Sequence, residues 1–282
     1  MRTTKFRLLG GTIDLASPVA VKAFAMKIIP LLPTFFAVLC LASAAKASVI
    51  TYIDDFTTTQ TANALNSTAT NTVSATGAVG GFRTFTLNSV DNDPDLGNTI
   101  MRVSTNAPTG PRFSLSTPTD ATSSFEVKWG GSDGTAGLGG IDFRGGIAAT
   151  NFSLISSTLN FTLRSADVAS GYTWSFIDTN SNVATYSSTF PSHSSVNPAI
   201  SYAISLASFS GSGIVDWSSI NFITLSGGGL ELDLSLRAPI SVTAAPIPEP
   251  GTWAVGALLL GGAAYTFWRR RQNTVVAPPA AA

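Results

Sequence analysis

A strict alternation of apolar and polar residues constrains the fold of this 282-residue chain more than any other feature. Residues 158–165 read TLNFTLRS, so that Leu159, Phe161 and Leu163 would share one face of an extended strand. Residues 230–236 read LELDLSL and would likewise place four leucines on one face. This period of two is typical of β-strands that are buried on one side. Shorter stretches with the same pattern are residues 82–87, 99–104, 123–129, 171–178 and 220–226.

Turn-forming residues separate these stretches. They occur at residues 91–94, 130–134, 180–182 and 227–229, where Asp, Asn, Gly and Pro favour a reversal of the chain. Ser and Thr make up 59 of the 200 residues from 48 to 247, which disfavours long helices. About a dozen short strands in such a segment predict an all-β fold, a two-sheet sandwich of the jelly-roll or lectin-like type. We therefore predict that residues 48–245 form an extracellular β-sandwich domain.

An apolar segment near the N-terminus, residues 28–45, has the features of a secretory signal peptide. Two lysines precede it, and the small residues Ala45 and Ala47 provide a cleavage site. The alternative is a transmembrane anchor, against which the two prolines and the small-residue end of the segment argue. We interpret residues 1–47 as an N-terminal extension and signal peptide, and we predict that the protein is exported.

A second apolar segment, residues 251–268, carries no charge over 18 residues. As a helix it would be about 27 Å long, close to the hydrocarbon thickness of a bilayer. It ends at Trp268 and is followed by Arg269, Arg270 and Arg271, a basic stop that orients the preceding domain outward. The alternative, a buried globular helix, leaves these three arginines unexplained. We therefore predict one C-terminal transmembrane helix.

The motif Pro248-Glu249-Pro250 stands directly before this segment. The motif, a glycine-containing apolar helix and a basic cluster follow one another over residues 246–271, and this arrangement resembles the PEP-CTERM sorting signal. The resemblance implies recognition and processing by exosortase, a membrane protease, and a final location at the cell surface or in the extracellular biofilm matrix. The tail of residues 272–282 is longer than such signals usually carry. The alternative interpretation of the motif is a stiff juxtamembrane spacer.

Two stretches of the body extend this resemblance. Residues 54–56 (DDF) and 80–84 (GGFRT) are similar to the start of many exported PEP-CTERM proteins. Domains of that class commonly look like lectin or carbohydrate-binding jelly rolls. The resemblance therefore implies a β domain that has extracellular polysaccharide among its partners.

The charge composition narrows the partners further. The whole chain has 16 basic and 16 acidic residues, whereas residues 48–247 have seven basic and 14 acidic residues, a net charge of −7. Such a domain is expected to be a poor partner for nucleic acid and for anionic glycan phosphates unless a cation bridges them. The one cysteine, Cys40, lies in the signal segment, and the one histidine is His193. These counts exclude an intramolecular disulfide, a zinc cluster and a Cys–His nucleophile pair.

Three carboxylates at alternate positions, Asp91, Asp93 and Asp95, form the best candidate for a metal site. An oxygen-rich turn of this kind suits calcium, although its glycine and glutamate positions do not match those of an EF-hand. The alternative is a solvated hairpin turn, which Asp, Asn and Pro favour without any ligand. No other cofactor is expected.

Candidate catalytic residues are few. A glycosidase needs two carboxylates beside a cleft, and the candidates are Glu126, Glu231 and Asp233, of which the last two would share a strand face. An outward acidic pair is ordinary on an amphipathic strand. A serine triad would depend wholly on His193, which we interpret as a surface loop residue. We therefore predict that the protein is not an enzyme.

Carbohydrate binding uses exposed aromatic side chains on a β surface, although sandwich cores use the same residues. Trp129, next to a glycine-rich loop, is the best candidate for such a platform. The leading hypothesis is a non-enzymatic exported surface or extracellular-matrix protein with a PEP-CTERM signal. The alternatives are a carbohydrate-binding module with the same anchor and a glycan hydrolase. Expected partners are an exosortase-type protease, the membrane and extracellular polysaccharide.

Overall fold

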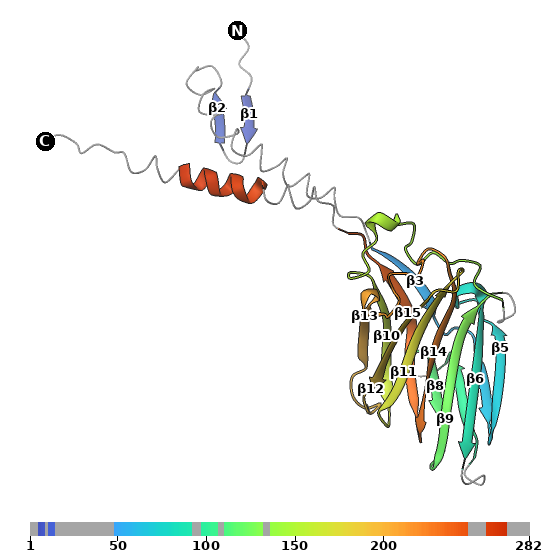
Figure 1. Ribbon diagram of the computed structural model, residues 1–282. Coiled ribbons are helices and arrows are strands. Elements are labelled where there is room, and N and C mark those ends of the chain that lie inside the picture. Colours follow the sequence, from blue (N-terminus) through green and yellow to red (C-terminus); the bar gives the residue numbers. More distant parts are fainter. Residues whose placement is uncertain are drawn as a thin grey trace. The chain divides into compact units, whose positions relative to one another are not determined.

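The structure, a computed structural model, describes residues 5–8, 11–14, 48–91, 97–106, 110–131, 136–247 and 258–269. The chain divides into two compact units, of which the larger is Ala47–Ile247 and the smaller combines Met1–Lys46 with Pro248–Ala282. The larger unit is a sandwich of two antiparallel β-sheets (Figure 1). This is the two-sheet, all-β architecture that the alternation predicts, while jelly-roll connectivity stays a prediction.

The first sheet is the seven-stranded sheet, with the order β13-β10-β15-β8-β7-β4 and with β3 also paired to β15. Strand β15 is its centre, because β10 runs along one side while β3 and β8 share the other side. Pro239, which has no N–H to donate, lies where the partner changes from β8 to β3. The strands are β3 (Val49–Asp54), β4 (Gln60–Ala64), β7 (Thr99–Ser104), β8 (Arg112–Ser116), β10 (Thr158–Ala166), β13 (Ile200–Ser205) and β15 (Leu234–Ala244).

The second sheet is the six-stranded sheet, with the order β12-β11-β14-β9-β6-β5. Its strands are β5 (Ser67–Ser74), β6 (Phe82–Asp91), β9 (Ala121–Gly130), β11 (Ser170–Asp178), β12 (Val183–Phe190) and β14 (Ile220–Leu230). Short 3-10 turns occur at η1 (Val79–Gly81), η3 (Ala149–Asn151) and η4 (Leu206–Ser208). Each of the shorter alternating stretches of the sequence lies inside one of the strands of the two sheets, so these predictions are confirmed.

The glycine run at residues 227–229 is not the turn that the sequence predicts. It continues β14, which pairs with β11 on one side and β9 on the other. A Cβ atom at Gly228 would lie 2.4 Å from the carbonyl oxygen of Ser123, so the strands can approach this closely only where the residue is glycine. The prediction was wrong because a run of glycines has two possible causes. It can allow a turn, or it can allow neighbouring strands to approach closely, and the local sequence does not tell these apart.

The leucine alternation at residues 230–236 also differs from the prediction of one strand. Strand β14 ends at Leu230, whose side chain is 55% exposed, and β15 begins at Leu234. Between them Glu231 has a φ of 53°, a left-handed conformation that interrupts an extended chain. The segment is therefore a turn that joins two consecutive strands, β14 of the six-stranded sheet and β15 of the seven-stranded sheet.

Aromatic side chains fill the space between the two sheets. The rings of Phe113 in β8 and Phe85 in β6 meet edge to face with centroids 5.6 Å apart. Phe161 in β10 and Trp174 in β11 make a second contact between the sheets, at 5.7 Å. All four side chains are buried, and burial of one such side chain contributes about 1.5–3 kcal/mol. The core therefore closes the inner face of both sheets.

One inward position of β6 carries a charge: Arg83 is fully buried. Its guanidinium pairs with the Asp54 carboxylate at 2.6 Å and donates to the Gln60 side-chain oxygen at 2.7 Å and the Thr58 carbonyl oxygen at 2.6 Å. The ring of Phe56 lies 5.6 Å from the guanidinium carbon. Burial raises the pKa of Asp54, against the opposing effect of the Arg83 charge. This network joins β3 and β4 of the seven-stranded sheet to β6 of the six-stranded sheet.

The smaller unit has two kinds of described element. Strands β1 (Lys5–Leu8) and β2 (Gly11–Asp14) pair as an antiparallel hairpin, and a helix covers residues 258–269. Within the described residues, no helix combines the length and the apolar run needed to cross a membrane. Arg269 is the last described residue of this helix. The predicted sorting and cleavage residues that fall outside the described residues are Ala45, Ala47, Pro248, Glu249, Pro250, Arg270 and Arg271.

Replacing Arg83 with methionine is expected to lower the free energy of unfolding by about 3–5 kcal/mol, because the Asp54 carboxylate would stay buried without its partner. Chemical denaturation followed by tryptophan fluorescence measures this change. The control is Arg102→Met on the outer surface, for which we expect a change within about 0.5 kcal/mol. Equal stability of the two variants would contradict a structural role of the buried ion pair.

Candidate ligand-binding groove

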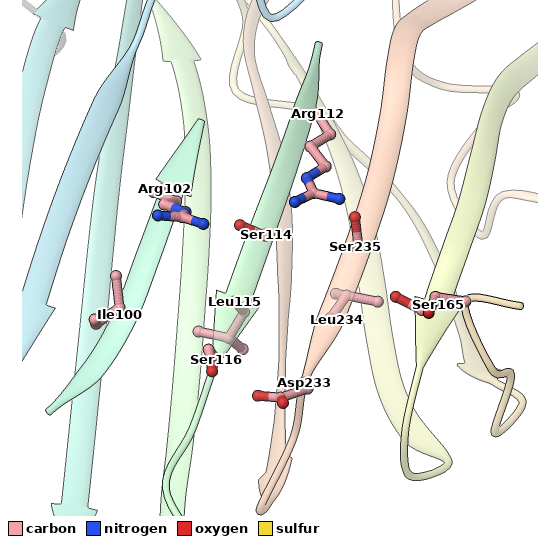
Figure 2. A pocket seen from close by; sticks show the side chains of 11 residues that line it. Ile100, Arg102, Arg112, Ser114, Leu115, Ser116, Ser165, Asp233, Leu234 and Ser235 are labelled. Atoms are coloured by element: carbon pink, nitrogen blue, oxygen red, sulfur yellow. The ribbon is translucent and has the colours of Figure 1, made fainter. Parts of the chain in front are cut away.

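A groove crosses the outer face of the seven-stranded sheet, over β7, β8, β15 and β10 (Figure 2). Its volume is about 390 Å³. The face is available because every second residue of each strand points away from the core. Most of the lining side chains end in a hydroxyl or a guanidinium group. The lining residues are Ile100, Arg102, Arg112, Ser114, Leu115, Ser116, Ser165, Ser195, Asp233, Leu234 and Ser235.

The strand register aligns these side chains in two rows across the sheet. The first row, from β7 through β8 and β15 to β10, is Arg102, Ser114, Ser235 and Ser165. The second row, in the same strand order, is Ser104, Arg112, Arg237 and Thr162. Each row brings residues from four separate parts of the chain into direct cross-strand contact distance. The groove is therefore a continuous strip of arginine and hydroxyl groups.

Two polar atoms of the groove have no hydrogen-bond partner within the described structure: Nε of Arg112 and Oγ of Ser235. Ser235 is only 7% exposed, although its hydroxyl faces the groove. A buried polar group without a partner costs about 1–3 kcal/mol relative to a satisfied one. A ligand with hydroxyl or acid groups would satisfy both atoms.

The outer face of this sheet is basic, although the domain is acidic as a whole. Asp54 is the single acidic residue in the seven strands, and it is buried on the inner side. The sheet thus concentrates positive charge where the rest of the surface is negative. The arginines of the seven strands are Arg102, Arg112, Arg164 and Arg237.

Sequence reasoning misses Arg102, Arg112 and Ser235 as site residues. The sequence could have indicated the two arginines only as outward residues of alternating strands, a pattern that is present in TIMRVS (residues 99–104) and RFSLS (residues 112–116). The sequence does not reveal, however, that β7, β8 and β15 lie side by side in this order, and only this adjacency makes a site of three ordinary outward residues.

A second hollow, of about 600 Å³, lies beside Tyr52 of β3. Tyr52 is 56% exposed, and no other aromatic side chain among the described residues of the larger unit is as accessible. Its ring offers a stacking surface to an apolar ligand face. The other lining residues of the hollow are Asp55, Thr76, Gly77, Ala78, Val79, Ala238 and Pro239.

The prediction of Trp129 as an exposed glycan platform is wrong. The side chain is 0% exposed because it occupies an inward position of β9. Its ring stacks on Trp174 with centroids 5.8 Å apart, and its indole Nε1–H donates to Asp54 at 2.7 Å. The glycines that follow Trp129 suggest that its side chain is exposed, but the alternation along β9 directs the side chain inward.

The structure does not place Glu126 beside Glu231 and Asp233, the other carboxylates proposed for a hydrolase. Glu231 and Asp233 lie in the turn between β14 and β15, where each accepts a hydrogen bond from a backbone N–H of the β8–β9 turn, at 2.8 and 3.0 Å. Glu126 lies in the middle of β9, five residues from the Ala121 carbonyl that accepts the Glu231 N–H. At the usual rise per residue this is about 16 Å of strand, more than the separation of a glycosidase pair.

His193 does not build a triad in the described residues. Its backbone forms an isolated bridge with Ala166 at the edge of the seven-stranded sheet, and its side chain is half-buried. The ring Nε2 is buried without a partner, and no described hydrogen bond joins the ring to a serine hydroxyl or a carboxylate. His193 lies in the connection between β12 and β13, as its interpretation as a surface loop residue predicts, but its side chain is only partly exposed.

The predicted calcium turn lies largely outside the described residues. Asp91 is the last residue of β6, and Asp93 and Asp95 belong to the segment that the structure does not describe. In the described parts of the chain, no group of three His, Cys, Asp or Glu side chains is arranged to hold a metal ion. The calcium site stays a prediction.

Perturbed carboxylates often mark active sites, and Asp178 and Asp216 are the candidates for that role. Burial of Asp178 acts to raise its pKa, but hydrogen bonds from the backbone N–H groups of Asp216, Asn182 and Asn180 outweigh burial and lower it. These bonds are 2.8–2.9 Å long. Hydrogen bonds from Ser218 lower the pKa of Asp216. Both carboxylates hold loop backbone in place, so neither is poised as a general acid or base.

No protein-family model matches the chain, and no curated protein matches it. Among solved structures, it is similar to the family 11 carbohydrate-binding module of a cellulosomal cellulase of Clostridium thermocellum, with a TM-score of 0.31, 14% identity and coverage of 72% of this chain and 97% of that module. A family 30 carbohydrate-binding module of Clostridium thermocellum gives a TM-score of 0.34, 12% identity and coverage of 50% and 80%. An exo-β-agarase gives a TM-score of 0.35 and 12% identity, with coverage of 59% of this chain and 24% of that chain. At such low scores the function has to follow from the groove itself.

Replacing Asp178 with asparagine is expected to lower the free energy of unfolding at pH 7 by about 1–3 kcal/mol, because an amide cannot accept all the N–H groups that surround the carboxylate. Since the pKa of Asp178 in the folded protein lies below its ordinary value of 3.8, the carboxylate stabilises the fold above pH 3.8, and this contribution is lost as the pH falls through the lowered value. Denaturation curves at pH 7 and at pH 3 should therefore show a smaller gap between wild type and variant at pH 3. The control is Asp142→Asn at an exposed turn, with a smaller loss at pH 7. A gap that widens in acid would contradict the assignment.

Proposed function

We propose that the larger unit is a non-enzymatic polysaccharide-binding domain of an exported surface or extracellular-matrix protein. The observation that carries this proposal is the groove of the seven-stranded sheet, where hydroxyl and guanidinium groups line a strip about 390 Å³ in volume. Sugar rings offer hydroxyls that both donate and accept hydrogen bonds, and the serine hydroxyls of the groove can do the same. A buried Ser235 hydroxyl without a partner fits such a ligand.

The shape and the chemistry of the face support a binding role rather than a catalytic one. The groove is open along the sheet, so that an extended polymer chain can lie across several strands. Tyr52, on the outer side of β3 in the same sheet, offers a ring for stacking against a sugar. Asp233 is the one carboxylate in the groove lining, and it already accepts a backbone hydrogen bond.

A bulky side chain in the middle of the groove is expected to abolish polysaccharide binding. In Ser114→Trp the indole would fill the centre of the first row, between Arg102 and Ser235, and we expect at least a tenfold loss of affinity, about 1.4 kcal/mol. Affinity electrophoresis in gels that contain soluble polysaccharides measures this loss.

The matched control is Ser124→Trp, an exposed position of β9 on the six-stranded sheet, which should bind like wild type. Retained binding by Ser114→Trp, or equal loss in both variants, would contradict the groove as the site. Circular dichroism of both variants verifies that they are folded.

The proposal includes export and sorting through the PEP-CTERM signal. The N-terminal segment with its Ala45 and Ala47 cleavage site and the C-terminal arrangement of residues 246–271 support it. The helix at 258–269 is also consistent with it, because nearly all of its residues are exposed. Apolar side chains in this state suit a lipid environment. Large exposed side chains of the helix are Leu258, Leu260, Tyr265, Phe267 and Trp268.

Processing by an exosortase-type protease predicts a new C-terminus. In a host that carries the protease, mass spectrometry of the mature protein should find an end between residues 246 and 251, and the change Glu249→Ala in the motif should abolish this cleavage. A mature protein that still ends at Ala282 in the presence of the protease would contradict the sorting proposal. It would leave the binding proposal for the larger unit unaffected.

A further inference from the structure

We propose that the groove selects an anionic polysaccharide and that Arg102 and Arg112 bind its carboxylate or sulfate groups. This inference rests on the proposed polysaccharide-binding function and names the class of glycan. It starts from a contrast: the net charge of residues 48–247 is −7, whereas the groove has two arginines and one carboxylate in its lining.

The strand register places Arg102 and Arg112 as diagonal neighbours on one face of the sheet. Arg102 is paired with Ser114, and Arg112 is two residues before Ser114 on the same side of β8. Such diagonal neighbours are about 7–8 Å apart across two strands. Figure 2 shows the side chains of both arginines among the residues that line the groove. Acid groups that are separated by about one sugar ring can reach both.

Neither arginine has an internal counter-ion among the described residues. No described ion pair involves Arg102 or Arg112, and Nε of Arg112 is buried without any acceptor among the described residues. Arginine presents a planar fork of donors that matches a carboxylate or a sulfate with two parallel hydrogen bonds. A bound acid group would therefore satisfy the donors that the protein itself leaves without an acceptor.

The cross-strand neighbour of Arg112 in β15 is Arg237. Like charges directly opposite each other on one face of a sheet destabilise it. Substitution of Arg112 should therefore weaken binding without a large loss of stability.

The remaining surface favours a glycan over a nucleic acid as the polyanion. The acidic remainder of the domain repels both kinds of polyanion, so the uncharged groups of the ligand decide between them. Single strands need aromatic platforms for their bases, and Tyr52 alone is well exposed among the described aromatic residues of the larger unit. An acidic polysaccharide combines acid groups for the arginines with ring hydroxyls for Ser114, Ser165 and Ser235.

The test compares matched pairs of polymers that differ only in charge, with the full-length chain in detergent. One pair is polygalacturonate and its highly methyl-esterified form, which differ in free carboxylates. The other pair is dextran sulfate and dextran. We expect at least one charged polymer to bind about tenfold more tightly than its neutral counterpart, with an affinity that falls as salt rises. The preferred pair tells whether the acid group is a carboxylate or a sulfate.

The variants Arg102→Ser and Arg112→Ser are each expected to weaken binding of the charged polymer about tenfold. Arg112→Lys keeps the charge but lacks the planar fork, so it should recover only part of the loss. The matched control is Arg164→Ser in the same sheet, because the Arg164 guanidinium already donates to the Asn197 carbonyl oxygen at 2.8 Å and does not line the groove. It should change the affinity less than twofold. Thermal unfolding of each variant verifies the fold.

The possible outcomes separate this inference from the function on which it rests. Equal binding of charged and neutral polymers that Ser114→Trp abolishes but the arginine variants do not change would overturn the inference and keep the proposed function. No binding to any of the four polymers would overturn both. Arginine-dependent binding of a single-stranded DNA probe as tight as that of the best polysaccharide would also overturn the inference, because it would show a site for polyanions in general.

Discussion

The buried ion pair between Arg83 and Asp54 is the interaction on which the sandwich depends. Two charges removed from water are tolerated only when they are paired and hydrogen-bonded, and here each guanidinium nitrogen donates at least one hydrogen bond. Gln60 and the Thr58 carbonyl accept from the two nitrogens that do not pair with Asp54, while the Trp129 indole and the Phe56 N–H donate to Asp54. These partners come from both sheets. One network therefore fixes how β3 and β4 of the seven-stranded sheet pack against β6 and β9 of the six-stranded sheet.

The groove follows from the same alternation that builds this core. Strand β8 directs Phe113 and Leu115 inward, and it directs Arg112 and Ser114 to the opposite face. Aromatic side chains pack the inner face of the sheet and stabilise the sandwich. The residues of the outer face do not contribute to this core, so they can carry charge. Arg83 and Arg112 show the two outcomes for one residue type: the inward arginine is surrounded by acceptors, whereas the outward one has an Nε–H without an acceptor in the described structure.

The two stretches that resemble the start of exported PEP-CTERM proteins meet in space. Asp54 and Phe56 come from the first stretch and Arg83 from the second, and they contact one another in the buried network. Gly80 between them has a φ of 74°, and a Cβ there would lie 2.4 Å from the Gly130 carbonyl oxygen. These residues therefore have a structural explanation in this chain, because each completes the ion-pair site or allows the backbone to approach it.

The sequence alone determined the all-β class and most of the strands, because alternation with a period of two depends only on which neighbours along the chain are apolar. It also contains the charge asymmetry between the body and the ends. It could not determine that residues 227–229 continue a strand, or that Arg102, Ser114 and Ser235 form one row. Each of these depends on which strand lies beside which, and that is decided by packing between segments far apart in the chain. Only the tertiary structure therefore turned ordinary outward residues into a groove and an inward arginine into the centre of the fold.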